Sequence, residues 1–129
     1  MRVAPDRVAV PPDAPAPPAE SAPFELPFMS GNEGYHRAME WRLAKGTWGR
    51  GPTAVWLRPR VPLVAGERPT PLECLVAATD SASGVAVVVD PAATFVNGDL
   101  TIALHRGPVG EWTCLDAATT GEPHGIGRP

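Results

Sequence analysis

The two cysteines are the first candidates for chemistry in this sequence. Cys74 and Cys114 each lie in an apolar stretch, and neither has a Cys or His nearby at the spacing of metal ligands. A free cysteine in such surroundings behaves as a small buried hydrophobe. We therefore expect both to be reduced core residues, and we expect no metal site and no cofactor.

The histidines offer few further candidates for a catalytic or binding role. His36 and His124 have no neighbouring partner in the sequence. His105 stands beside Arg106, which leaves two interpretations open: an acid–base or phosphate-contacting group, or a structural histidine at the end of a strand. The structural interpretation is the commoner one.

Asp80 and Asn97 are polar residues beside predicted elements. Taken alone, Asp80 near the end of a helix is typical of a solvated carboxylate or a cap. Asn97 precedes Gly98, a pair typical of a tight turn because both residues tolerate positive φ. A turn and a functional site are compatible at this position.

The clearest structural signal is a helix start at Thr70. Thr70 can accept from the amide of Glu73, Glu73 can reach back to Thr70, and Pro71 has the torsion of a first helical residue. Ser83-Gly84 is a plausible end. The expected buried face has residues spaced by three and four positions; they are Leu72, Leu75, Val76 and Thr79. Ala77 and Ala78 are small enough for close approach to a sheet.

Strand patterns lie on both sides of this helix. Alternating residues predict a strand over 35–43, and residues suited to a pleated surface predict its hairpin partner over 53–58. After the helix, periodicity alone does not assign the apolar run 85–89, but its length and β-branching favour a strand. The segment 95–104 begins with a turn at 97–99 and continues as a strand, and a further strand is expected over 111–119. One helix between a hairpin and a run of strands is an α+β arrangement, in which the helix packs against an antiparallel sheet.

Composition divides the chain into three parts. Many of the 17 prolines fall within residues 1–30, which excludes a helix or a central strand there and predicts a linker or extended arm. We expect a folded domain over 31–120 and an irregular tail over 121–129.

Charge and hydropathy limit the partners and the location. A net charge of −3 offers no basic surplus for nucleic acid or for an anionic membrane. The N-terminus lacks the pattern of a secretory signal, and no apolar run is long enough to cross a bilayer. These features predict a cytoplasmic protein.

Several motifs in the expected domain resemble one family in order and spacing. Together they span about residues 34–120 and are similar to the C-terminal half of TesB-type, double-hotdog acyl-CoA thioesterases. The motifs are Gly34-Tyr35-His36-Arg37-Ala38-Met39-Glu40-Trp41-Arg42, Pro62-Leu63-Val64-Ala65-Gly66-Glu67, Thr70-Pro71-Leu72-Glu73, Ala77-Ala78-Thr79-Asp80, Phe95-Val96-Asn97-Gly98-Asp99-Leu100-Thr101 and Leu104-His105-Arg106-Gly107-Pro108-Val109-Gly110-Glu111-Trp112.

The resemblance implies a hotdog fold, in which an antiparallel sheet wraps around one central helix. It also implies a site for acyl-CoA at the junction between two hotdog domains. By motif position, Asp80 matches the family's catalytic Asp, and Asn97 matches its Thr, Ser or Asn. The family's Gln would lie beyond Gly125 and has no counterpart, so we expect a hotdog cut off before its last strands.

The implied function is a thioesterase-like domain of lipid metabolism, related to enzymes that hydrolyse acyl-CoA to fatty acid and CoA, and inactive as an isolated chain. Two alternatives stay open. One is a non-catalytic hotdog subunit or acyl-CoA-binding module that pairs with another hotdog domain, either a second copy or a separate chain. The other is a truncated gene product.

Overall fold

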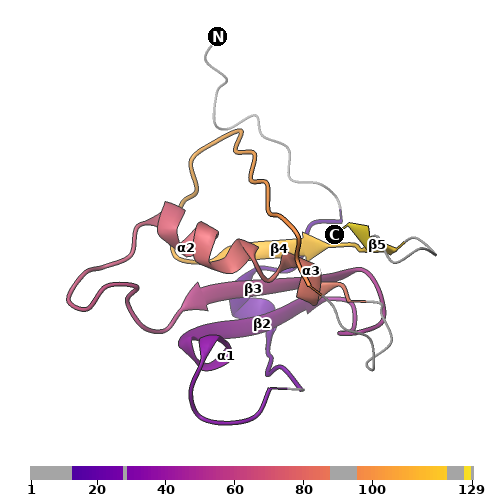
Figure 1. Cartoon of the computed structure of the whole chain (residues 1–129), viewed down its shortest axis with the longest axis horizontal. Helices are drawn as coiled ribbons and strands as arrows, with labels where there is room; N and C mark the ends of the chain where they lie inside the picture. The colour runs from indigo at the N-terminus through magenta and orange to yellow at the C-terminus, as the bar shows by residue number, and fades with distance from the viewer. Residues whose placement is uncertain (1–12, 28, 88–95, 122–126, 129) are drawn as a thin grey trace.

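The structure is a computed structural model of the 129-residue chain, and it describes residues 13–27, 29–87, 96–121 and 127–128. Its centre is a four-stranded antiparallel sheet with the order β1-β2-β3-β4. Helix α2 lies along one face of this sheet, and residues 96–112 arch beyond α2 before the chain returns to β4 (Figure 1). The predicted α+β class is confirmed, and the arrangement agrees with a hotdog fold.

Strands β2 (Met39–Lys45) and β3 (Thr53–Pro59) form the expected hairpin. Trp41 pairs with Leu57 and Leu43 with Val55, so these apolar side chains share one face of the sheet. Gly46 begins the connecting loop at φ 82°, and a Cβ there would clash with the Pro52 carbonyl oxygen. Only glycine fits this position.

Strand β4 (Thr113–Ala117) pairs with β3 and lies within the predicted 111–119 range. The Pro-rich region supplies the opposite edge of the sheet. It contains the 3₁₀ helix η2 (Pro18–Glu20) and strand β1 (Ala22–Pro23), which pairs with β2. Leu26, just after β1, is buried in the core.

The predicted strand over 35–43 is wrong for its first four residues. Residues 35–38 form the short helix α1 (Tyr35–Ala38), and β2 begins only at Met39. Gly34 at φ 112° precedes the turn, and its carbonyl accepts from the amides of Arg37 and Ala38. The helical turn brings the Tyr35 ring edge-on to Trp41, with 6.1 Å between the ring centroids.

Helix α2 (Pro71–Thr79) starts as predicted. The Thr70 hydroxyl accepts from the Glu73 amide, and the Glu73 carboxylate accepts from the Thr70 amide at 2.7 Å. A further short helix, α3 (Ala82–Val85), follows the C-terminal end of α2 and includes the expected Ser83-Gly84 stop.

The expected buried face of α2 is wrong for Leu72 and Val76, whereas the expected close approach to the sheet is confirmed at Ala78. Leu72 and Val76 are 49% and 50% exposed, whereas Cys74 and Ala78 face the sheet at 2% and 0%. Residues four apart share a helix face, and the small side chains of Cys74 and Ala78 let the helix backbone approach the sheet closely. Thr79 and Leu75 are half-buried. The larger apolar residues are therefore left pointing outward.

Two predicted strands after α2 are not observed. Val85 belongs to α3, residues 86–87 carry no strand, and 88–89 lie outside the described residues. Residues 96–104 also form no strand, and Phe95 is not described. A strand exists only where a neighbour accepts its hydrogen bonds, and β4 pairs with β3 rather than with this segment.

The tail is less irregular than expected, because β5 (Thr120–Gly121) pairs with β6 (Gly127–Arg128). The core lies between the sheet and the helices. Within the described residues, no helix is both long and apolar enough to cross a bilayer. The buried apolar cluster consists of Leu26, Met39, Trp41, Val55, Leu57, Ala78, Val85 and Leu115.

Candidate functional site

Asp80 and Asn97 are brought together across 17 positions of sequence. The Asn97 amide donates from Nδ2 to Asp80 Oδ1 at 3.3 Å and to the Asp80 backbone carbonyl at 3.4 Å. Both residues are exposed. The two predicted site residues therefore share one polar cluster on the surface.

The C-terminal end of α2 positions Asp80. Asp80 is the residue that caps this helix, and the Ser81 amide donates to the Ala78 carbonyl at 3.1 Å. Ala78 is fully buried against the sheet, so the end of the helix is anchored. Asn97 lies two positions beyond the undescribed stretch 88–95, at the start of the segment that leads over α2.

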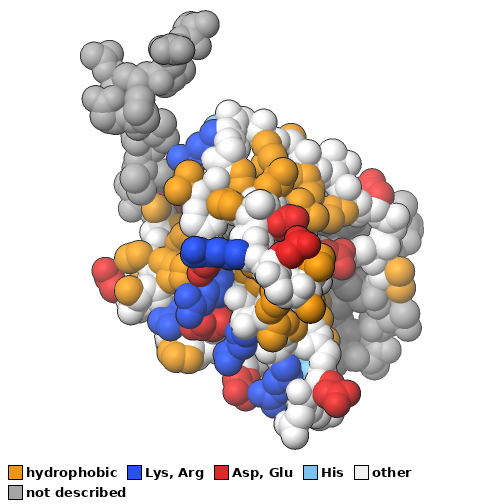
Figure 2. Space-filling view, turned by 90° about the vertical axis from the view of Figure 1, so that its left-hand side faces the viewer, with side chains coloured by type: hydrophobic (Ala, Val, Ile, Leu, Met, Phe, Trp, Pro, Cys, Tyr) orange, Lys and Arg blue, Asp and Glu red, His pale blue; other side chains and the backbone are white. Residues whose placement is uncertain are grey.

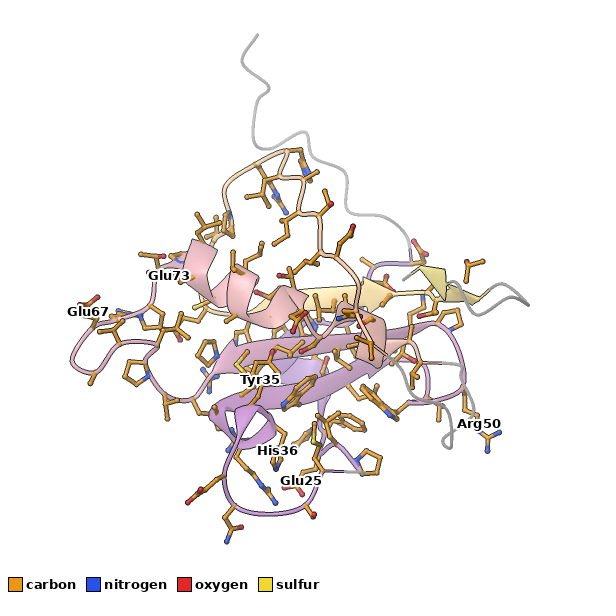
Figure 3. All side chains as sticks on the ribbon, in the orientation of Figure 1. Glu25, Tyr35, His36, Arg50, Glu67 and Glu73 are labelled. Carbon is orange, nitrogen blue, oxygen red and sulfur yellow. The ribbon has the colours of Figure 1, made fainter. Side chains whose placement is uncertain are left out.

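Tyr35 and Ser81 extend this cluster. The Tyr35 hydroxyl donates to the Ala77 carbonyl at 2.8 Å and accepts from Ser81 Oγ at 2.9 Å. The last carbonyls of a helix lack partners within it, so Tyr35 satisfies one of them from a distant element. Figure 3 shows Tyr35 on α1, with its side chain extending over the sheet.

Sequence reasoning missed the role of Tyr35. The residue was expected to begin a strand, where its hydroxyl would have no reason to reach the end of α2. The only local signal was Gly34, which permits the positive φ from which the helical turn starts.

The pKa of Tyr35 is raised above its ordinary value. Burial of the hydroxyl is the largest cause, and the negative charge of Asp80 adds to it, while the hydrogen bond from Ser81 opposes both. Tyr35 as a whole is 42% exposed. The negative charge of Asp80 therefore raises the pKa of Tyr35, and the same carboxylate accepts a hydrogen bond from Asn97.

A partly apolar pocket is lined by residues that are close in sequence to Asp80 and Asn97. Thr79 precedes Asp80 in the chain, and Leu100 follows Asn97 by three positions, whereas Asp80 and Asn97 themselves are not among the lining residues. Asp116 adds a carboxylate at the β4 side. The lining residues are Thr79, Ala82, Leu100, Thr101, Ile102, Ala103, Asp116, Ala117 and Ala118.

Neither His36 nor His105 is among the residues that line the pocket beside Thr79. His105 and Arg106 line a different pocket, which they share with Trp112 and other residues at the edge of β4. His36 lies on α1, and its buried Nε2 has no hydrogen-bond partner within the described structure. His124 falls outside the described residues.

The cysteines are both free thiols, Cys74 buried and Cys114 partly so. Burial is the main reason why their pKa values are raised, in Cys114 to about 11. Raised pKa values suppress the reactive thiolate. Among the described residues, no group of three or more His, Cys, Asp and Glu side chains could hold a metal ion.

The chemistry available at the polar cluster is that of a carboxylate oriented by an amide. An exposed carboxylate can accept a proton from a bound water, and an amide can hold the carboxylate or the water in a fixed position. A neighbouring pocket with apolar walls can hold an acyl chain. These side chains supply a proton acceptor and a hydrogen-bond donor, which are groups that hydrolysis of an acyl derivative can use.

Comparison with protein families identifies the relationship. Residues 5–128 match the model of the acyl-CoA thioesterase C-terminal domain. Neither a curated protein nor a solved structure matches the chain significantly. The family match covers nearly the whole sequence and agrees with the antiparallel sheet and the helix α2 packed against it. The chain therefore belongs to the acyl-CoA thioesterase C-terminal domain family.

Proposed function

We propose that this domain supplies half of an acyl-CoA thioesterase site, in which Asp80 and Asn97 hold the water that attacks the thioester. The observation that supports the proposal most directly is the 3.3 Å contact between Asn97 Nδ2 and Asp80 Oδ1. Family membership supplies the substrate class. The reaction would serve acyl-CoA metabolism in the cytoplasm.

In the proposed reaction, Asp80 accepts a proton as water attacks the thioester carbonyl. The carbonyl oxygen becomes an oxyanion in the tetrahedral intermediate. Collapse of this intermediate breaks the carbon–sulfur bond, releases the CoA thiolate and leaves the fatty acid. Asn97 keeps the carboxylate oriented throughout, which contributes to catalysis by restricting the geometry of attack.

The acyl chain would lie in the pocket beside Thr79. Its lining residues Thr79 and Leu100 are sequence neighbours of Asp80 and Asn97, so a thioester at Asp80 would place its acyl carbons against Leu100 and Ile102. Burying each methylene of a substrate contributes about 0.8 kcal/mol. This arrangement predicts a preference for acyl chains over short polar acyl groups.

A donor for the oxyanion would come from a second hotdog domain. The free amides at the start of α2 lie at the other end of this nine-residue helix, about 13 Å from Asp80 at 1.5 Å per residue. Docking of another domain would also remove Asp80 from bulk solvent, where a carboxylate is a poor base. We therefore expect the isolated domain to be inactive.

Outward-facing apolar side chains support this pairing. Leu72 and Val76 form an exposed stripe on α2, and Leu100, Ile102 and Leu104 are exposed on the segment beyond it. Exposed apolar clusters often mark interaction sites. Figure 2 shows hydrophobic side chains interspersed with charges of both signs on the face that it draws. The partner would be a second copy of this chain or a separate hotdog chain.

A second candidate is an acyl-CoA-binding module without catalysis. It is favoured by the exposure of Asp80, because a carboxylate in bulk solvent is a poor base. Such a module would keep the apolar pocket and the pairing surface. It would bind palmitoyl-CoA without releasing CoA.

The two candidates are separated by measuring palmitoyl-CoA binding and CoA release across a concentration series, with sedimentation to record the oligomeric state. The proposal expects hydrolysis that rises with the assembled fraction. Asp80→Asn should lower the rate about 100-fold, as loss of a positioned catalytic group does. Asp99→Asn, another exposed carboxylate on the same segment as Asn97, is the matched control and should change the rate little.

Each result has a distinct meaning. Binding without hydrolysis in every assembled state would support the binding module. Hydrolysis unaffected by Asp80→Asn would remove Asp80 from the mechanism. If no assembled form binds or hydrolyses palmitoyl-CoA, both candidates fail.

A further inference from the structure

The face of the sheet opposite α2 is occupied by the Pro-rich segment of the chain. Trp41 and Leu57 point toward the core, so their neighbours Arg42 and Trp56 point to the other face. There the Trp56 indole donates from Nε1 to the Ala16 carbonyl at 2.7 Å, and Arg42 donates from Nη1 to the Pro18 carbonyl at 3.0 Å. Both bonds end on backbone atoms of the Pro-rich segment.

Backbone carbonyls are what a Pro-rich segment offers. Proline has no N–H, so a run of prolines cannot form its own ladder and leaves its carbonyls for other donors. Pro17 has φ −63° and ψ 159°, which are the torsions of a polyproline II helix. An indole N–H on an aromatic surface that meets such carbonyls is the arrangement by which Pro-rich peptides are recognised.

The donors on the sheet are held in place by their own contacts. Arg42 donates to the Glu40 carboxylate at 2.9 Å, and its guanidinium lies over the Trp112 ring at 5.3 Å from the centroid. Arg58 binds the other oxygen of Glu40 at 2.7 Å and also lies over Trp112. Arg42 is thus fixed while one of its N–H groups remains directed at the Pro-rich segment.

The Pro-rich segment is also shaped for this surface. Ser21 donates from Oγ to the Ala16 and Pro17 carbonyls at 3.1 and 3.0 Å, which bends the chain just before strand β1. Lys45 and Asp13 form an exposed ion pair at 3.8 Å, and a pair in this position contributes little free energy to holding the segment in place. The backbone contacts of Trp56 and Arg42 therefore determine where the segment lies.

We propose that Trp56 and Arg42 form a recognition surface for Pro-rich segments, which residues 13–18 of the same chain occupy as an exchangeable ligand. The surface depends on carbonyl positions and polyproline torsions rather than on side chains of the segment. When the segment is displaced, the same donors bind a Pro-rich peptide supplied in trans. The occupant in trans is a peptide of the same chemistry as residues 13–20, Asp13-Ala14-Pro15-Ala16-Pro17-Pro18-Ala19-Glu20.

The attached segment competes strongly with a free peptide. Connection through β1 gives it an effective concentration of the millimolar order. A trans peptide therefore binds only when the internal segment is weakened. The test needs a full-length variant whose own segment no longer fits, and Pro17→Gly/Pro18→Gly supplies one, because glycine does not hold polyproline torsions.

The readout is the indole N–H of Trp56 in proton–nitrogen NMR spectra. The chain has four tryptophans, and Trp56→Phe assigns the Trp56 signal by its disappearance. In the natural sequence we expect slow exchange of this N–H with water. In the double Gly variant we expect exchange at least about tenfold faster, since an open N–H loses the protection of its hydrogen bond. The backbone signals of Val55 and Leu57 should stay unchanged and serve as the folding control.

Adding a synthetic peptide of residues 13–20 to the double Gly variant should shift the Trp56 indole signal saturably and restore slow exchange. The same peptide with glycine in place of all three prolines should do neither. Equally fast exchange in the natural and double Gly sequences would overturn the proposal. So would the absence of any shift at several times the millimolar effective concentration, or equal binding of both peptides.

Discussion

Ser81 Oγ donates a hydrogen bond to the Tyr35 hydroxyl at 2.9 Å, which joins α1 to the turn that carries Asp80. Two residues 46 positions apart thus meet at the C-terminal end of the central helix. Because Tyr35 is the only tyrosine in the chain, its ionisation can be followed by ultraviolet absorbance without interference from another phenol. The phenol is therefore a natural reporter of charge beside Asp80.

The first prediction concerns the pKa of Tyr35, which should lie above 10.0 in the folded protein. Burial raises it, Asp80 raises it further and the Ser81 hydrogen bond lowers it. Asp80→Asn should therefore lower the pKa, and Ser81→Ala should raise it. Absorbance titration of the three proteins measures both shifts, and equal shifts of one sign would contradict the arrangement.

A raised phenol pKa also has a consequence for stability. The folded state holds the phenol proton more tightly than the unfolded state does, so this contribution is complete below the unfolded pKa near 10. It is lost as the pH rises through the folded pKa. In Tyr35→Phe the free energy of unfolding should change less between pH 9 and pH 11 than in the natural sequence.

The second prediction concerns the capping box of α2. Thr70→Ala removes the hydroxyl that accepts from the Glu73 amide, and it should lower the free energy of unfolding by about 1 kcal/mol. Urea denaturation followed by circular dichroism measures the change. Thr70→Ser keeps the acceptor and is the control, which should stay within a few tenths of a kcal/mol. Equal losses in both variants would show that the hydroxyl is not responsible.

The third prediction concerns Glu40 on the outer face of the sheet. Burial raises the pKa of its carboxyl, but the hydrogen bonds and charges of Arg42 and Arg58 outweigh burial and hold the pKa below its ordinary value of 4.5. A lowered folded pKa means that the stabilisation is present above pH 4.5 and is lost as the pH falls through the folded value. Glu40→Gln should therefore destabilise the protein at pH 7 and have a smaller effect at pH 3.

Glu25→Gln is the matched control for Glu40, since Glu25 also pairs with an arginine but is 85% exposed at its side chain. Exposed pairs contribute little, so this variant should show a small effect at both pH values. Thermal unfolding at several pH values measures the two profiles. A pH-independent loss in Glu40→Gln would mean that packing, and not charge, explains its effect.

The fourth prediction concerns the thiols. Burial is the main cause that raises the pKa of Cys114 to about 11, and the charge of Asp116 adds to it. At pH 8 roughly one thiol in a thousand would then be ionised, so alkylation of Cys114 should be slow in the folded protein and fast in urea. Mass spectrometry after iodoacetamide treatment measures this. Cys74→Ser isolates the Cys114 signal, and rapid alkylation of folded protein would contradict the prediction.

The features predictable from sequence were those determined locally. The capping box at Thr70 and the strand 53–58 depend on neighbouring residues, and both formed as expected. The contact between Asp80 and Asn97 was implied by family motifs, whereas no local pattern connects Tyr35 to Ala77. Such contacts depend on the angle at which distant elements pack, which a single sequence does not contain.

The segment 95–104 shows why a strand pattern can mislead. Leu100, Ile102 and Leu104 alternate with other residues as in a half-buried strand, yet they remain 38% to 51% exposed without a sheet partner. The alternation indicates that one side of the segment is suited to pack on an apolar surface. That surface can belong to the same chain or to a partner. In the proposed assembly, a second domain would cover these side chains.

The last prediction tests which face of α2 is buried. Ala78 is fully enclosed with Val55 and Leu57 in the core, so Ala78→Leu should lower the free energy of unfolding by about 1 to 3 kcal/mol through overpacking. Val76→Leu adds one methylene on the exposed face and should stay within about 0.5 kcal/mol. Urea denaturation compares the two, and a larger loss in Val76→Leu would restore the face first expected from the spacing. Because Val76 also lies in the proposed pairing surface, Val76→Asp should weaken self-association while leaving the unfolding of the monomer nearly unchanged.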